Sequence, residues 1–218
     1  MDVDLFYGDG YSMEFKGNEV SLKGMITERL PMSGRGCPVV KITVTEKPEN
    51  MDLPSIFVAK VYDGRFLRDP LDSIPDETDY PQTVYKAETT AYEILINDDR
   101  VKNHLARYYG HYKVKCENGK REFDAILIEF REGKAPEEIS EALAKKLEVE
   151  LKPVLKQCHV LGVAHGDVKP GNLHMKTSDG DGVVLLDWGG SRIREGKDDP
   201  VFETRCQGDI RGLEQLAA

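Results

Sequence analysis

Side chains suited to phosphate chemistry gather in the segment VAHGDVKPGNLHM, at positions 163–175. Asp167 is a candidate general base, Lys169 carries a positive charge, and Asn172 offers a neutral amide oxygen to a metal ion. Two glycines and a proline interrupt the segment, so a loop is expected rather than a regular helix or strand. Such a loop places a base, a cation and a metal ligand close together in the chain.

A further carboxylate follows an apolar run in VVLLDWGG, at positions 183–190. Asp187 is expected at the end of a strand, and oxygen ligands such as Asn172 and Asp187 suit magnesium. Transfer of a phosphoryl group from ATP needs metal ions held by oxygen ligands, a cation on the phosphates, and a carboxylate that accepts the proton of the nucleophile. The chain contains all of these groups.

The predicted cation on the phosphates is Lys60, which lies inside an apolar strand. A charge there is costly without a partner, and Glu88 on the next predicted helix could supply one. Gly34 and Gly36 lie between the first two predicted strands, where glycine lets the backbone approach phosphates closely.

The elements expected to position these groups are strands in the first half of the chain and helices in the second half. Residue patterns predict strands over 20–30, 38–46, 55–63, 108–116 and 123–130, and a helix over 83–97. An apolar stripe predicts helix from 137 to 161, where Pro153 indicates a kink or two abutting helices and Gly162 a stop. A short strand pair and a final helix follow, and the boundary between halves falls near 131–136.

Composition restricts the partners and the compartment. A formal net charge of -9 disfavours nucleic acid and anionic membranes as main partners. The four cysteines are widely spaced, which indicates free thiols in a reducing compartment rather than a zinc site or disulfides. No apolar run approaches about 20 residues, and no signal peptide is visible. An intracellular, cytoplasmic protein is therefore expected.

Four motifs in order resemble those of protein kinases. They are VAK (58–60), Glu88, HGDVKPGN (165–172) and DWG (187–189), and the resemblance covers roughly residues 20–215. The stretches AKVYDGRF and AETTAYEIL, with the HGD form of the loop, are similar to divergent kinase-like proteins common in fungi. Asp209 resembles the aspartate of the kinase helix that braces the catalytic loop.

The resemblance implies an α+β, two-lobed protein-kinase-like fold. It implies an N-terminal extension over 1–19, then an N-lobe over 20–131 made of an antiparallel β-sheet and one helix. A short, mainly helical C-lobe over 132–218 would lack the distal helices of the family, so the fold is either minimal or truncated.

The resemblance also implies ATP and Mg²⁺ as cofactors and gives each site residue a role. Lys60 would hold the α- and β-phosphates and pair with Glu88, while Gly34 and Gly36 would approach the phosphates through their backbone. The backbone of Glu129 and Arg131 would receive adenine. Asp167 would be the base, Lys169 would contact the γ-phosphate, and Asn172 and Asp187 would ligate magnesium.

Departures from the family pattern keep several functions open. Gly166 replaces the arginine that contacts a phosphorylated activation segment, which implies activity without such phosphorylation, and HGD also occurs in small-molecule kinases. The main expectation is an ATP-dependent phosphotransferase, Ser/Thr protein-kinase-like, acting on a hydroxyl of a protein or a small molecule. The alternative is a pseudokinase, a nucleotide-binding or scaffold module, which the thin glycine loop favours. A non-kinase α+β domain with chance motifs would bind no nucleotide.

Overall fold

The computed structural model describes residues 7–17, 20–31, 37–49, 51–66, 79–116, 121–133, 135–136, 138–176 and 182–217. The chain divides into two compact units. The barrel unit comprises Met1–Tyr85 and Tyr108–Phe130, and the helical unit comprises Lys86–Arg107 and Arg131–Ala218.

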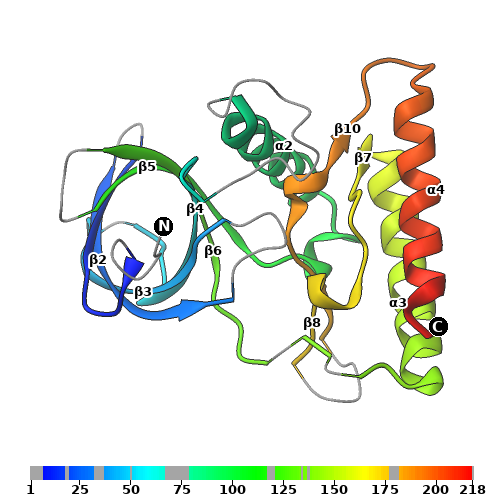
Figure 1. The fold of residues 1–218 in the computed structure, drawn as a ribbon, viewed down its shortest axis with the longest axis horizontal. Coiled ribbons are helices and arrows are strands. Elements are labelled where there is room, and N and C mark those ends of the chain that lie inside the picture. Colours follow the sequence, from blue (N-terminus) through cyan, green and yellow to red (C-terminus); the bar gives the residue numbers. More distant parts are fainter. Residues whose placement is uncertain are drawn as a thin grey trace. The chain divides into compact units, whose positions relative to one another are not determined.

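Six antiparallel strands form the closed sheet of the barrel unit (Figure 1). They are β1 (Ser12–Lys16), β2 (Ser21–Leu30), β3 (Val39–Glu46), β4 (Ile56–Tyr62), β5 (Tyr108–Cys116) and β6 (Glu122–Glu129). Their order is β1-β2-β3-β4-β6-β5, and the sheet closes because β1 pairs with both β2 and β5. Phe15, for example, lies opposite Leu22 on one side and Val114 on the other.

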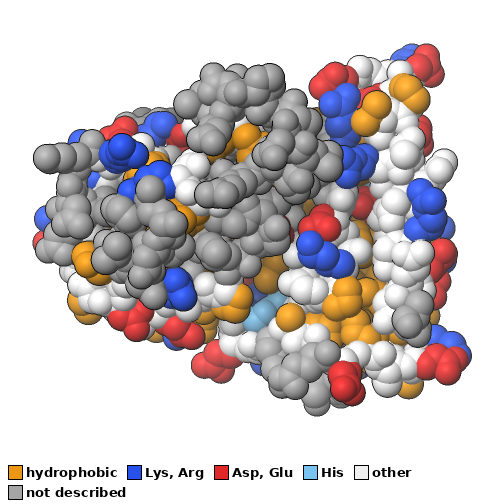
Figure 2. Space-filling view, viewed as in Figure 1, with side chains coloured by type: hydrophobic (Ala, Val, Ile, Leu, Met, Phe, Trp, Pro, Cys, Tyr) orange, Lys and Arg blue, Asp and Glu red, His pale blue; other side chains and the backbone are white. Residues whose placement is uncertain are grey.

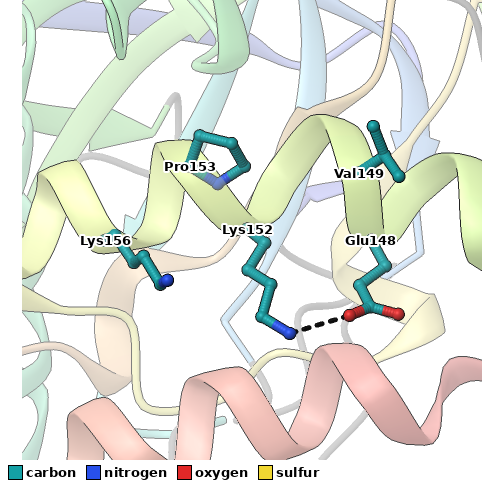
Figure 3. Close-up of a pocket in the computed structure, with 5 residues that line it drawn as sticks. All are labelled: Glu148, Val149, Lys152, Pro153 and Lys156. Carbon is teal, nitrogen blue, oxygen red and sulfur yellow. Dashed lines mark hydrogen bonds and ion pairs between the residues drawn. The ribbon is translucent and has the colours of Figure 1, made fainter.

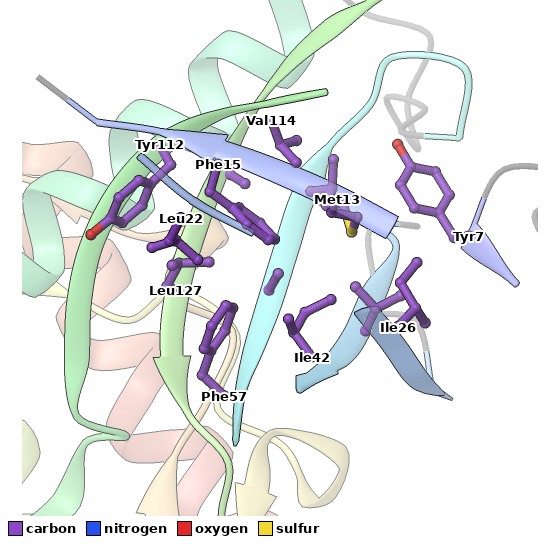
Figure 4. Close-up of a cluster of buried hydrophobic side chains, with 14 of the residues drawn as sticks. Tyr7, Met13, Phe15, Leu22, Ile26, Ile42, Phe57, Tyr112, Val114 and Leu127 are labelled. Carbon is purple, nitrogen blue, oxygen red and sulfur yellow. The ribbon is translucent and has the colours of Figure 1, made fainter. Parts of the chain in front are cut away.

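Alternate residues of all six strands point into the barrel and fill it (Figure 4). The rings of Phe15 and Phe57 meet edge to face, with centroids 5.6 Å apart. Gly24 takes an inward position on β2, where a Cβ atom would overlap the side chain of Ile42. The buried cluster consists of Tyr7, Met13, Phe15, Leu22, Ile26, Val40, Ile42, Leu53, Phe57, Ala59, Val61, Tyr112, Val114, Ala125 and Leu127.

The closed barrel shows that the predicted two-lobed protein-kinase-like fold was wrong. That prediction had an N-lobe made of an antiparallel sheet and one helix, whereas the sheet is a closed barrel in which β1 joins β2 to β5 and leaves no edge. β1 lies within residues 1–19, which were expected to form an extension. Its residues Met13 and Phe15 are fully buried, so this segment belongs to the barrel core. The described chain is a mixture of a six-stranded barrel and three α-helices.

Helices and short strand pairs make up the helical unit. Its elements, in chain order, are most of α2 (Asp79–Leu95), η1 (Lys102–His104), α3 (Glu141–Val160), β7 (Val163–Ala164), η2 (Pro170–Asn172), β8 (Leu173–His174), β9 (Val184–Leu185), η3 (Trp188–Gly190), β10 (Arg192–Ile193), α4 (Pro200–Glu214) and η4 (Gln215–Ala217). β7 pairs with β10, and β8 pairs with β9. None of the α-helices in the described ranges is long and apolar enough to cross a bilayer.

The apolar stripe predicted over 137–161 forms α3, which lies beside α4 (Figure 1). Ser140 caps α3, because its Oγ accepts a hydrogen bond from the backbone N–H of Leu143 (3.2 Å). The helix runs through Pro153 as one element rather than two. It ends before Gly162, whose φ of +84° is a left-handed conformation that favours glycine.

Acidic and basic side chains are interspersed on the face drawn in Figure 2. Many exposed charges form ion pairs, among them Lys23 with Glu46 (2.9 Å) and Lys152 with Glu214 (2.9 Å). Exposed pairs of this kind contribute little to stability, so the apolar interior of each unit is the main source of its stability.

Candidate functional site

Two short strand pairs fix the ends of the loop that carries Asp167. β7 leads into the loop and pairs with β10, with Ala164 opposite Arg192. β8 leads out of it and pairs with β9, with Leu173 opposite Leu185. Val163, Ala164 and Leu173 of these strands are buried, and the polar residues between the strands form the connection.

Hydrogen bonds join the three predicted catalytic residues of this loop. The Oδ2 atom of Asp167 accepts from the Lys169 ammonium (2.7 Å) and from the Asn172 amide nitrogen (3.0 Å). The same nitrogen donates to the backbone carbonyl of Asp167 (2.8 Å). Asn172 is buried, whereas the side chains of Asp167 and Lys169 are 28% and 44% exposed. The carboxylate and the ammonium can therefore meet a ligand.

Asp187 is attached to this loop through its neighbour Leu186. The backbone N–H of Leu186 donates to the carbonyl of Asn172 (2.8 Å), and its carbonyl accepts from Nε2 of His165 (3.0 Å). Asp187 itself is buried, with φ 62° and ψ 63°. It is the one non-glycine residue with positive φ among those that the structure describes, and such strain is typical of functional sites.

His165 supports the loop and is neutral. Its Nε2 donates to Leu186, while its Nδ1 accepts from the backbone N–H of Asp167 (3.3 Å). One donating and one accepting nitrogen define the neutral ring. Complete burial also lowers the pKa of His165, which favours the uncharged form. The ring packs on Trp188 with centroids 4.5 Å apart, so both residues have structural roles.

The α4 helix holds the loop through Asp209, as the resemblance implied. Oδ2 of Asp209 accepts from the backbone N–H of His165 (2.8 Å), and Oδ1 accepts from that of Gly166 (2.7 Å). One turn further along α4, a Cβ atom on Gly212 would lie 2.5 Å from the carbonyl oxygen of Val168. Glycine at that position therefore allows the helix to approach the loop closely.

The remaining predicted residues lie on other elements. Lys60 is 3% exposed and points to the outer side of β4, opposite the inward residues Phe57, Ala59 and Val61. Its Nζ lies 5.9 Å from the ring centre of Tyr62.

Glu129 ends β6 in the barrel unit, while Glu88 on α2 and Arg131 belong to the helical unit. Gly34 and Gly36 lie outside the described residues. The structure thus groups Asp167, Lys169, Asn172 and Asp187 in the helical unit, and it places Lys60 and Glu129 in the barrel unit.

The side-chain oxygen atoms of Asn172 and Asp187 are of the type that could hold a magnesium ion. The Asn172 nitrogen makes both hydrogen bonds to Asp167, so its amide oxygen is the atom left for a cation. Within the described ranges, no three His, Cys, Asp or Glu side chains are placed to hold a metal. Mg²⁺ needs no such cage, because it retains water and binds phosphate oxygens alongside one or two protein ligands.

A pocket on α3 is less suited to chemistry (Figure 3). It is lined by Glu148, Val149, Lys152, Pro153 and Lys156, none of which belongs to the loop. The Lys152 ammonium within it is already bonded to Glu148 (2.8 Å) and to Glu214 (2.9 Å). We therefore take the loop at 165–172, with Asp187, as the candidate site.

Comparison with known proteins adds no assignment to this geometry. No model of a protein family matches the sequence, and no curated protein matches it significantly. A functional conclusion therefore depends on the side chains of the candidate site.

Proposed function

We propose that the protein is an ATP-dependent phosphotransferase that moves the γ-phosphate of ATP to a hydroxyl group. The observation that carries this proposal is the hydrogen-bonded set of Asp167, Lys169 and Asn172 on one loop, with Asp187 attached to that loop through Leu186. Phosphoryl transfer depends mainly on positioning and on neutralising phosphate charge. A loop with a base, a cation and two oxygen donors for a metal meets these needs.

Each side chain has one task in this proposal. Asp167 accepts the proton of the hydroxyl nucleophile through Oδ1, because both hydrogen bonds that it receives fall on Oδ2. Lys169 moves from Asp167 to the transferred phosphate. Asn172 and Asp187 hold magnesium, which supplies positive charge against the phosphate oxygens.

The motif resemblance extends the proposal to the nucleotide. It implies that Lys60 would hold the α- and β-phosphates and pair with Glu88, and that the backbone of Glu129 and Arg131 would receive adenine. The burial of the Lys60 and Glu88 side chains supports a role other than that of ordinary surface charges. The acceptor is a serine or threonine of a protein, or the hydroxyl of a small molecule.

A nucleotide-binding scaffold without turnover is the second candidate function. The ion pair between Lys169 and Asp167 favours it, because the ammonium bonds the carboxylate that must act as the base. An enzyme must break this pair in each cycle, whereas a scaffold can keep it.

The two functions differ in their response to Asp167→Asn. We expect slow magnesium-dependent turnover of ATP by the wild type, a fall of about 10²–10⁴-fold in the variant, and unchanged nucleotide binding. Asp198→Asn, at an exposed position of the same unit, is the matched control and should retain full turnover. Equal rates in wild type and Asp167→Asn would favour the scaffold, and an absence of nucleotide binding would refute both.

Thermal shifts test the metal ligands separately. ATP with magnesium should raise the melting temperature of the wild type more than ATP alone does, because a ligand that binds the folded state stabilises it. Asn172→Ala should remove this difference. A magnesium effect that survives this substitution would count against the assigned ligand.

A further inference from the structure

His159 contacts the carboxylate that holds the candidate loop, and the sequence motifs gave it no role. It lies in the last turn of α3, and its Nε2 is 2.9 Å from Oδ2 of Asp209. A carboxylate can only accept, so the imidazole N–H is the donor. Oδ2 of Asp209 therefore accepts from both His159 and the backbone N–H of His165.

The hydrogen bond from His159 matters because the Asp209 carboxylate is buried. Asp209 is 1% exposed, and a buried carboxylate is costly unless it is hydrogen-bonded or paired. Its other two donors are the backbone N–H groups of the loop itself. His165 cannot help with its ring, because both ring nitrogens are bonded elsewhere. Among the described residues, His159 is the side chain bonded to Asp209.

Several contacts fix the orientation of the His159 ring. Its edge meets the ring of Phe202 on α4, with centroids 6.5 Å apart and an interplanar angle of 84°. The guanidinium of Arg194 covers the same Phe202 ring at 4.4 Å and donates to the His159 carbonyl (3.1 Å). The ring therefore has a packing contact on α4 that does not involve the loop.

We propose that His159 is a positioning residue that acts through Asp209. By donating to Oδ2, it keeps the carboxylate in the orientation that accepts from His165 and Gly166, and so it sets the place of Asp167. The expected effect of His159 on turnover rests on the proposed phosphotransfer. A misplacement of about 1 Å in a reacting group can cost about 10²-fold in rate. The effect on the loop does not depend on that activity.

Two substitutions separate the hydrogen bond from the packing. His159→Phe keeps a ring against Phe202 but lacks the donor, whereas His159→Gln keeps an N–H donor near the position of Nε2. His111→Phe, at an exposed position of β5, is the matched control. We would measure amide hydrogen exchange in peptides covering 163–168, together with kcat and KM for ATP.

We expect His159→Phe to speed exchange at His165 and Gly166 and to lower kcat by about 10–100-fold, with KM for ATP changed less than about twofold. His159→Gln should restore both properties toward wild type. Should His159→Phe fail to fold, His159→Asn, which is polar but shorter, replaces it and should likewise not restore the loop.

Unchanged exchange at the two amides in His159→Phe would overturn the proposal. A His159→Gln variant that behaves like His159→Phe would also overturn it, because the donor would then not matter. Failure of the proposed function gives a different result: the wild type would show no turnover, while the exchange data would still decide the role of His159.

Discussion

A methyl group added at Gly166 tests whether the loop needs glycine at this position. Gly166 has a φ of +78°, which costs a residue with a side chain about 1–2 kcal/mol. A Cβ atom there would also overlap the carbonyl oxygen of Gly190. Relief of this overlap must shift the loop and weaken the bond from the Gly166 N–H to Asp209, which adds about 1–3 kcal/mol.

We therefore expect Gly166→Ala to lower the free energy of unfolding by about 2–5 kcal/mol, the sum of these two costs. Urea denaturation followed by fluorescence measures this change, since the single Trp188 lies buried beside the loop. Turnover should fall by about 10–100-fold at temperatures where the variant is folded, because Asp167 is the next residue.

Gly171→Ala in the same loop is the control. No described atom lies within 4 Å of a Cβ built on Gly171, and its φ is not positive. Its free energy of unfolding should be unchanged or higher by up to about 1 kcal/mol, because alanine restricts the unfolded chain. If Gly166→Ala were as stable and active as Gly171→Ala, the reasoning from φ and the Gly190 contact would be refuted.

Three further predictions concern other parts of the chain. Gly24→Ala should lower the free energy of unfolding by about 1–3 kcal/mol in urea denaturation, because the methyl group overlaps Ile42 inside the barrel. The Arg100 side chain lowers the pKa of Asp98 from 3.8 to about 2. The free energy of unfolding should therefore decrease as the pH falls through this range, and Asp98→Asn should remove this decrease from the pH profile of unfolding. Burial raises the pKa of the Cys158 thiol to about 12, so native protein at about pH 8 should resist iodoacetamide at this residue, as peptide mass spectrometry would show.

The strands and helices could be predicted because their signals are local. The predicted strands over 20–30 and 55–63 differ from β2 and β4 by a residue at one or both ends, since alternation of apolar and polar residues records burial directly. The stripe that predicted α3 records one buried helix face in the same way. Pro153 did not divide this helix. It is exposed, on the face of α3 opposite the buried stripe, where a proline is compatible with a continuous helix.

Closure of the barrel could not be predicted from the same signals. β1 has five residues, and its alternation resembles that of any short strand. What closes the sheet is the pairing of Met13 with Cys116 and of Phe15 with Val114, which lie far away along the chain. A strand pattern shows which face is buried, but it does not identify the strands that pair with it, so the sequence alone predicts only an extension over residues 1–19.

Local sequence patterns likewise identified some residues of the candidate site and not others. Asp167, Lys169 and Asn172 were found because the loop places them within a few positions of each other. His159 was missed because its role comes from Asp209, 50 positions away. Its one local signal is a histidine beside the buried Cys158 at the end of an apolar helix, and this pattern is equally typical of a surface residue.

Burial separates the residues that hold this loop from those that could do chemistry. Asp209 is buried and accepts two loop amides, whereas Asp167 is partly exposed and pairs with an exposed Lys169. Asp209→Asn replaces an accepting oxygen with a donor, which leaves a buried N–H without its acceptor and should cost about 1–3 kcal/mol of unfolding free energy. Asp167→Asn should cost less than about 1 kcal/mol, because exposed ion pairs contribute little, yet it should abolish most turnover. Equal losses of unfolding free energy for Asp209→Asn and Asp167→Asn in urea denaturation would show that the two carboxylates do not have separate structural and catalytic roles.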